Sequence, residues 1–274
     1  MYLDLPEDAR MAERRIAMTI PVGLLLVCGA MAASVGGLIL VQRLVPTAVR
    51  RQHNDVAGFI YAVLGVTYAV LLGLMVVAVW EEWNRATVTA DNEANALAEV
   101  FWIAAKMPEA EGTKIQELVR SYATIVVDEE WALMQQQKSS PKAWDRLDEI
   151  RASLQDFDPS DQQEQIIYEQ SLENMRTLAD TRRDRLLEAE QGLPIILWVV
   201  LILGGVIVVG FTYLFGLDST VIHLLMVASL TLIISLVLFT VAALDYPFEG
   251  DITIHPDAME QVLGRFETSS LSNL

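Results

Sequence analysis

Hydrophobic residues gather in four long blocks along this chain, and charged residues fill the stretches between them. Each block holds about 20 or more largely uncharged residues, the length that crosses roughly 30 Å of hydrocarbon as a helix. The blocks cover residues 16–41, 56–80, 193–216 and 221–244. The pattern therefore predicts four transmembrane helices.

Between the second and third blocks the pattern changes to the 3.6-residue period of charged, amphipathic helices. The segment 86–106 carries apolar residues at 94, 97, 98, 101 and 105, and Pro108 and Gly112 are expected to end its helix. Further helices are predicted over 114–137, 142–155 and 160–190, and another begins near Pro256 in the tail. No segment alternates with period two, so we predict an all-α membrane protein.

Four crossings divide the chain into a leader, two helix pairs, a middle domain and a tail. The expected ranges are 1–15, 16–80, 81–192, 193–244 and 245–274. The leader, the middle domain and the tail then share one side of the membrane. Seven arginines lie near the span ends on that side and three on the other, so the positive-inside rule predicts that this side is cytoplasmic. Helices 86–106 and 160–190 are expected to continue the second and third spans into the cytoplasm.

Charge and composition exclude several classes of function. The net charge is −17, and 81–192 alone holds 24 acidic and 12 basic residues, a difference of −12, so nucleic acid is not an expected partner. The acidic excess either attracts cations or only keeps a helical surface soluble. The single cysteine, Cys28, and three scattered histidines form no metal-binding spacing, and no nucleophile motif occurs. We therefore expect no cofactor, no metal and no enzymatic activity.

The second block carries two distinct stripes at helical spacing. The first consists of small residues, which let helices approach closely in lipid, and is predicted to pack against neighbouring helices: Gly58, Ala62, Gly65, Ala69 and Gly73. The second consists of aliphatic residues, and one more step at the same spacing reaches Glu81; its members are Val63, Val66, Val70, Leu74 and Val77.

The aliphatic stripe has two interpretations. If several copies of the helix surround an axis, the stripe forms a hydrophobic constriction, and Glu81 side chains form an acidic ring at its exit that favours cations. The alternative is a buried helix interface that ends in one charge at the water boundary. Periodicity alone does not choose between them.

Two segments resemble the bestrophin family. The run LGLMVVAVWEEWNRA, 72–86, resembles the bestrophin signature at the end of the second transmembrane helix, and LDYPFEGDITIHPDAMEQVL, 244–263, resembles the segment after the last span. The tail match rests on Pro247, Phe248, Glu249 and Asp251, followed by Asp257. The four-span layout agrees, and the whole looks most like a bacterial bestrophin-like family.

The resemblance implies a homo-oligomeric, pentameric ion channel in the bacterial inner membrane, with both termini cytoplasmic and inorganic ions passing along the second helix. Carried over through the Leu-Gly register, the hydrophobic neck is Val66, Val70 and Leu74. Animal members bind calcium through a run of closely spaced acidic residues, but here only Glu249 and Asp251 follow Pro247-Phe248 closely. We therefore do not expect calcium regulation, and the tail motif is expected to dock the tail on the domain. The alternative is a non-conducting oligomeric scaffold or sensor whose cytoplasmic helices bind a partner.

Overall fold

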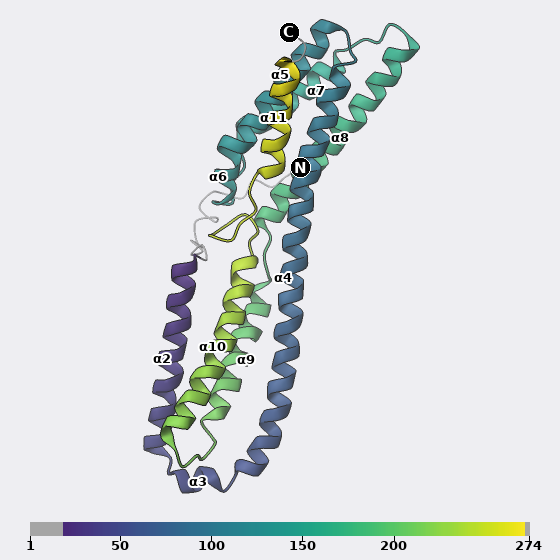
Figure 1. The fold of residues 1–274 in the computed structure, drawn as a ribbon. Coiled ribbons are helices and arrows are strands. Elements are labelled where there is room, and N and C mark those ends of the chain that lie inside the picture. Colours follow the sequence, from purple (N-terminus) through teal and green to yellow (C-terminus); the bar gives the residue numbers. More distant parts are fainter. Residues whose placement is uncertain (1–18, 272–274) are drawn as a thin grey trace, which may run out of the picture.

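The computed structural model describes residues 19–271 and shows helices and connecting loops, with no strand among those residues. The expected leader 1–15 lies outside the described residues. The helices form a long bundle with a membrane half at one end and a second group of helices, which we call the head, at the other (Figure 1). The all-α prediction with four membrane helices is confirmed.

The membrane half contains four helices that are long and apolar enough to span a bilayer. They are α2 (Ile20–Leu44), the first half of α4 (Asn54–Ala104), α9 (Ile195–Thr212) and α10 (Thr220–Leu244). The short α3 (Thr47–Arg51) joins α2 to α4 at the end far from the head (Figure 1). These bounds lie within four residues of the predicted blocks at each end, except that α4 runs on without a break.

A tyrosine holds α4 against α9 inside the membrane half. The Tyr68 hydroxyl donates to the carbonyl of Leu201 at 2.8 Å. A Cβ added at Gly204 would lie 2.7 Å from the Tyr68 ring, and one at Gly205 would lie 2.9 Å from its hydroxyl oxygen. The two glycines therefore allow a polar ring to satisfy its hydroxyl within an apolar core, where an unpaired hydroxyl would be costly.

The predicted continuation of the second span is confirmed, because α4 is one helix of 51 residues that reaches far into the head. The continuation on the return path is wrong in detail. The helix α8 (Gln162–Glu190) stops at Gln191, whose backbone is extended (φ −87°, ψ 140°), and α9 starts after Pro194. Proline has no N–H to donate to a preceding turn, so the chain breaks here into two helices.

The head is built from both long helices and four shorter segments. The segments are α5 (Glu109–Ile125), a π-helical turn (Val126–Glu130) that runs into α6 (Trp131–Met134), α7 (Pro141–Gln155) and the tail helix α11 (Asp257–Leu271). The prediction that Gly112 ends a helix is wrong, because Gly112 lies inside α5. A Cβ added there would approach the Ala104 carbonyl oxygen to 2.4 Å. The glycine thus permits close packing of α5 on α4.

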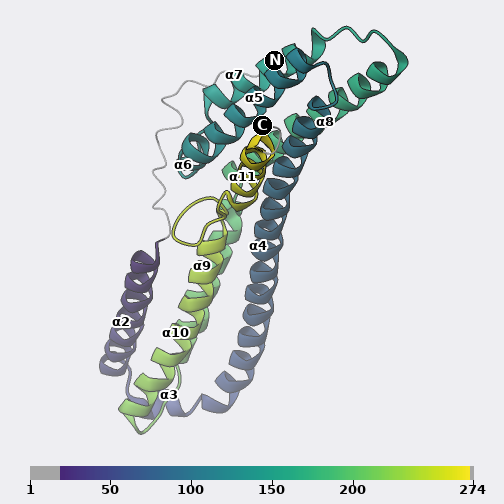
Figure 2. The ribbon, with the colours of Figure 1, turned by 45° about the horizontal axis from the view of Figure 1, so that its top comes forward.

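Within the head, α4 and α8 lie side by side and run in opposite directions (Figures 1 and 2). On each helix, one line of buried positions alternates by four and three residues, the spacing of a coiled-coil seam. On α4 these are residues 86, 90, 93, 97, 100 and 104, and on α8 they are residues 171, 175, 178, 182, 185 and 189. The predicted stripe on α4 is correct at 94, 97 and 101 and wrong at Ala105, which is exposed.

Candidate functional site

The aliphatic stripe on α4 has no cover within this chain. Val66, Val70 and Leu74 are 66%, 58% and 60% exposed, and Val63 and Val77 are also exposed. The opposite face of the same helix is buried against α9 and α10, through Tyr68 and the buried α4 residues that follow it toward the head. One side of α4 is therefore fixed by its own chain, and the stripe faces outward, toward lipid or other subunits.

The small-residue face of α4 is not filled by this chain either. A Cβ added at Gly58, Gly65 or Gly73 would meet no atom within 4 Å, and Ala62 and Ala69 are exposed. The close helix packing expected of this face does not occur inside one chain. Packing against another copy stays a prediction.

The adjacent glutamates at the end of the membrane half are not equivalent. Glu81 is exposed and continues the aliphatic stripe. Glu82 is partly buried. Burial raises the pKa of Glu188 on α8, and the charge of Glu82 adds a smaller rise. Of the two, Glu81 alone extends the stripe, as the helical spacing predicts.

The tail motif docks on the head through aromatic and backbone contacts. Phe248 is buried, and its ring meets the Trp131 ring edge to face at 5.8 Å between centroids. The indole N–H of Trp131 donates to the Ile254 carbonyl at 2.8 Å. The turn closes on itself, since the Ile254 N–H donates to the Pro247 carbonyl at 2.8 Å.

Carboxylates of the segment after α10 bind backbone and amide donors at helix ends. Asp251 accepts from the backbone N–H of Ile20, the first residue of α2, at 2.8 Å. Asp245 accepts from the backbone N–H of Leu193 at 2.6 Å, just before α9, and Glu249 accepts from the Gln137 amide at 2.9 Å. Carboxylates at helix N-termini satisfy free N–H groups and complement the helix dipole. The segment thus connects the head to the starts of two membrane helices.

A buried ion network lies in the middle of the head, and sequence analysis missed it. Glu93 on α4, Glu130 on the π-helical turn, and Arg182 and Arg185 on α8 are fully buried. Glu130 accepts from Arg182 Nη2 at 2.6 Å and from Arg185 Nη2 at 2.8 Å, and the Arg185 Nε–H donates to Glu93. Two carboxylates face two guanidinium groups, so the network is neutral as a whole.

Aromatic rings and a hydroxyl complete this network. The Tyr122 hydroxyl lies between Glu93, to which it donates at 2.5 Å, and Arg182, from which it accepts at 3.1 Å. Arg185 lies over the Trp131 ring at 4.9 Å from its centroid, a favourable cation–π distance. Because Trp131 also binds the tail, the network and the tail segment share one side chain.

The charges in the network shift its pKa values in the directions that keep it ionised. Burial alone would raise the pKa of Glu130, but Arg185 and Arg182 outweigh burial, and the pKa lies below its usual value. The pKa of Arg185 is raised in spite of burial because Glu93 and Glu130 face it. Burial, reinforced by Glu93, raises the pKa of Tyr122 well above its usual value, so its hydroxyl stays protonated.

Comparison with known proteins now decides the family. The sequence profile of the Bestrophin-like domain matches residues 28–259, most of the chain. This chain belongs to the bestrophin-like family. A search among curated proteins finds no match.

Solved structures of a bacterial bestrophin homologue from Klebsiella pneumoniae share the fold of this bestrophin-like chain. One single-site variant of that homologue has a TM-score of 0.66 and 14% sequence identity, and the match covers 88% of this chain and 97% of the other. A second structure of the same homologue gives a TM-score of 0.63 at 14% identity, covering 88% and 96%. At this identity the similarity establishes the fold.

A signal for the buried network is present in this bestrophin-like sequence. Arg182 and Arg185 lie three residues apart, in step with Leu178 and Ala189 on the buried seam of α8. Long charged side chains at successive seam positions indicate buried partners, since lone buried charges are strongly unfavourable. In the sequence analysis, Arg182 and Arg185 counted only among the seven arginines near the span ends, so their position on the buried seam was missed.

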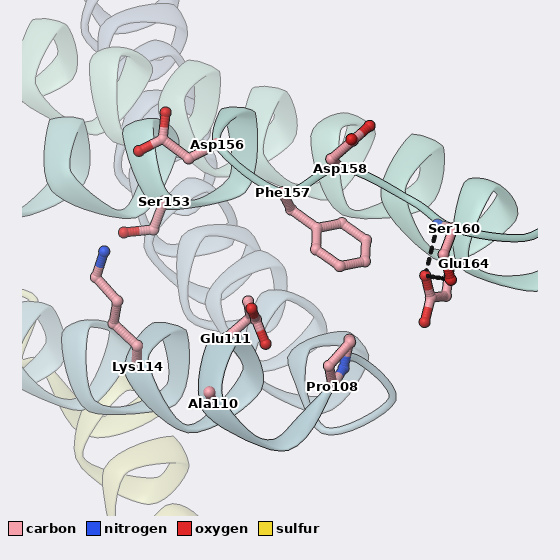
Figure 3. Close-up of a pocket in the computed structure, with 10 residues that line it drawn as sticks. All are labelled: Pro108, Ala110, Glu111, Lys114, Ser153, Asp156, Phe157, Asp158, Ser160 and Glu164. Carbon is pink, nitrogen blue, oxygen red and sulfur yellow. Dashed lines mark hydrogen bonds between the residues drawn. The ribbon is translucent and has the colours of Figure 1, made fainter.

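The head also has an open pocket of about 570 Å³, whose lining residues are drawn in Figure 3. The elements that form it lie at the end of the head away from the membrane half (Figure 1). The pocket lies between the start of α5, the end of α7 and the loop before α8. Phe157 and Pro108 border it together with four carboxylates, and Ser160 donates to one of these, Glu164, at 2.7 Å. None of the predicted site residues lines this pocket. Within the described part of the chain, no group of three or more His, Cys, Asp or Glu residues could hold a metal ion.

Proposed function

We propose that this bestrophin-like protein is a homo-oligomeric, pentameric ion channel in which the α4 helices surround a central pore. The observation that carries the proposal is the uncovered aliphatic stripe of α4, whose residues Val66, Val70 and Leu74 are each more than half exposed. Other spans also expose apolar residues to lipid, such as Leu25 on α2 and Leu225 on α10. The α4 line differs from these because the same helical spacing continues it to Glu81. Membership of the bestrophin-like family supports the same arrangement.

In this proposal the three stripe residues form a hydrophobic neck. Aliphatic rings exclude water when the pore is narrow, so a neck of this kind closes the pore by dewetting and opens when α4 helices move apart. The glycine and alanine face then packs against the neighbouring subunit, where small residues allow close contact. The lipid bilayer surrounds the remaining spans.

Cation preference follows from the acidic groups along the proposed path. Glu81 lies directly past the neck on the same face and is exposed, so several copies would place a ring of carboxylates at its exit. The domain 81–192 carries 24 acidic and 12 basic residues, which lowers the electrostatic potential beyond that ring. Both features favour cations over anions.

The proposed location is the bacterial inner membrane, with the head 81–192 and the tail 245–274 in the cytoplasm. The head and the tail would lie on the same side of the membrane, because the tail helix α11 packs on α4 and α5 in the head (Figure 2). The loops beside α3 then face the opposite side. Arginines near the span ends favour a cytoplasmic head.

Reconstitution in planar lipid bilayers tests the proposal. Purified oligomers should conduct, and replacing the permeant cation should shift the reversal potential more than replacing the anion. The subunit number follows from the mass of the purified particle. Well-folded oligomers that pass no current under voltage, pH or calcium changes would refute the channel and favour the non-conducting scaffold.

A charge reversal separates the two neighbouring glutamates. Glu81→Lys should weaken cation preference and shift the reversal potential toward that of the anion, because it places positive charge in the pathway. The matched control is Glu82→Lys, whose side chain lies toward α8 and away from the stripe. Equal shifts in both variants would remove Glu81 from the account of selectivity.

A further inference from the structure

The base of the head contains a half-buried carboxyl group that the proposed pore does not use. Glu188 lies on α8, in its last turn before the break at 191–194, and contacts α4. Its Oε1 atom accepts from the Thr89 hydroxyl of α4 at 3.2 Å. Its Oε2 atom is buried and has no hydrogen-bond partner among the described residues. A buried carboxylate oxygen without a donor disfavours the charged form.

The charges around Glu188 come from both helices of the contact. Glu82 and Arg85 face it from α4, and Asp184 lies one turn earlier on α8 itself. Burial raises the pKa of Glu188, the Thr89 hydrogen bond and Arg85 oppose that rise, and Asp184 and Glu82 add to it. The geometry and the charges therefore agree that the neutral carboxyl group fits this contact better.

The position of Glu188 gives its ionisation a structural consequence. The charge of Glu82 acts on Glu188, and Glu82 is the residue directly after Glu81 of the stripe. The head seam of α4 begins four residues later, at Ala86. The helical hydrogen bonding of α8 ends at Gln191, before α9 begins after Pro194. The contact between Glu188 and α4 thus helps to hold α4 at Thr89, about two helical turns beyond Glu81.

We propose that Glu188 is a proton-binding group that tightens the contact between α4 and α8 at the base of the head. The folded contact binds the proton more strongly than a solvated carboxyl group does. Its stability is therefore greatest at acidic pH and falls as the pH rises from about 4.5 through the raised pKa of the folded state. The effect on ion flow rests on the proposed channel function, in which a looser α4 lets the neck widen.

Hydrogen–deuterium exchange of the full-length oligomer tests the proton site directly. After correction for intrinsic exchange rates, backbone amides of residues 184–192 should open several-fold more often at about pH 7.5 than at about pH 5. Glu188→Gln, which is neutral and keeps an acceptor for Thr89, should show the protected pattern at both values. Glu190→Gln, an exposed control on the same helix, should behave like the wild type.

Three results would overturn the proposal: no pH dependence in the wild type, an unchanged dependence in Glu188→Gln, or equal loss of it in Glu190→Gln. Ion flux in vesicles adds a second readout, which should rise with pH in the wild type and vary less in Glu188→Gln. Vesicles without flux at any pH would refute the channel function. The exchange experiment would still decide whether Glu188 binds the proton.

Discussion

Removing one charge from the buried network of the head should destabilise it strongly. In Glu130→Gln the neutral amide replaces a carboxylate that accepts four hydrogen bonds, including the backbone N–H of Ser140 at 2.9 Å. Glu93 is then left with two buried guanidinium groups, Arg182 and Arg185. Leaving a buried charge unpaired costs about 3–5 kcal/mol, which corresponds to roughly two to three and a half powers of ten in an opening equilibrium.

Hydrogen exchange of the α8 backbone measures that cost without complete unfolding of a membrane protein. The amides near Arg182 should exchange about a hundredfold or more faster in Glu130→Gln than in the wild type. The neighbouring Glu129→Gln is a matched control, since Glu129 forms an exposed ion pair with Lys142 that is worth about 0–1 kcal/mol. A change below tenfold in Glu130→Gln, or one equal to the control, would refute the reasoning.

Three further predictions follow from single contacts. Trp131→Phe removes the hydrogen bond to the Ile254 carbonyl, which is worth about 1 kcal/mol. A protease should therefore cleave the tail about fivefold faster than in the wild type. Unchanged cleavage would mean that other contacts hold the tail. Gly216→Ala places a Cβ 2.4 Å from the backbone nitrogen of Arg51. The thermal unfolding midpoint in detergent should therefore fall by an amount equivalent to about 1–3 kcal/mol. An unaltered midpoint would contradict this close packing of Gly216 on Arg51. The pKa of Glu130 is lowered in the folded head, so the stability that its carboxylate adds to the head is present above about pH 4.5 and is lost as the pH falls through the folded pKa. Acid should therefore reduce the protection of head amides from hydrogen exchange more in the wild type than in Glu130→Gln.

The helical plan follows from the sequence because lipid imposes a simple requirement. Spans must satisfy their backbone internally and be long enough, and both conditions can be counted along a chain. The stripe from Val63 to Glu81 is also visible, since helical spacing alone puts these residues on one face. Helical spacing alone does not show that this stripe is exposed, because its exposure depends on which face of α4 the other spans pack against.

The head network could not be derived from periodicity alone. Its four charged residues come from three segments separated by about 35 to 50 residues, and only the antiparallel pairing of α4 with α8 brings them together. The π-helical turn at Val126–Glu130 adds one residue to a turn and so changes which side chains face the core. On α4, Ala104 follows the buried Phe101 by three residues, whereas Ala105 is the exposed residue that caps the end of the helix.

Thiol accessibility tests most directly whether the α4 stripe lines a pore. Cys28 is the only cysteine, so replacing it with serine gives a background in which one new thiol can be followed. In oligomers reconstituted in bilayers, a charged thiol reagent should block the current through Val70→Cys. It should leave unchanged the current through the control Leu25→Cys, which is 72% exposed on α2. Current through Val70→Cys that persists after the thiol has been fully modified would contradict a pore lined by α4.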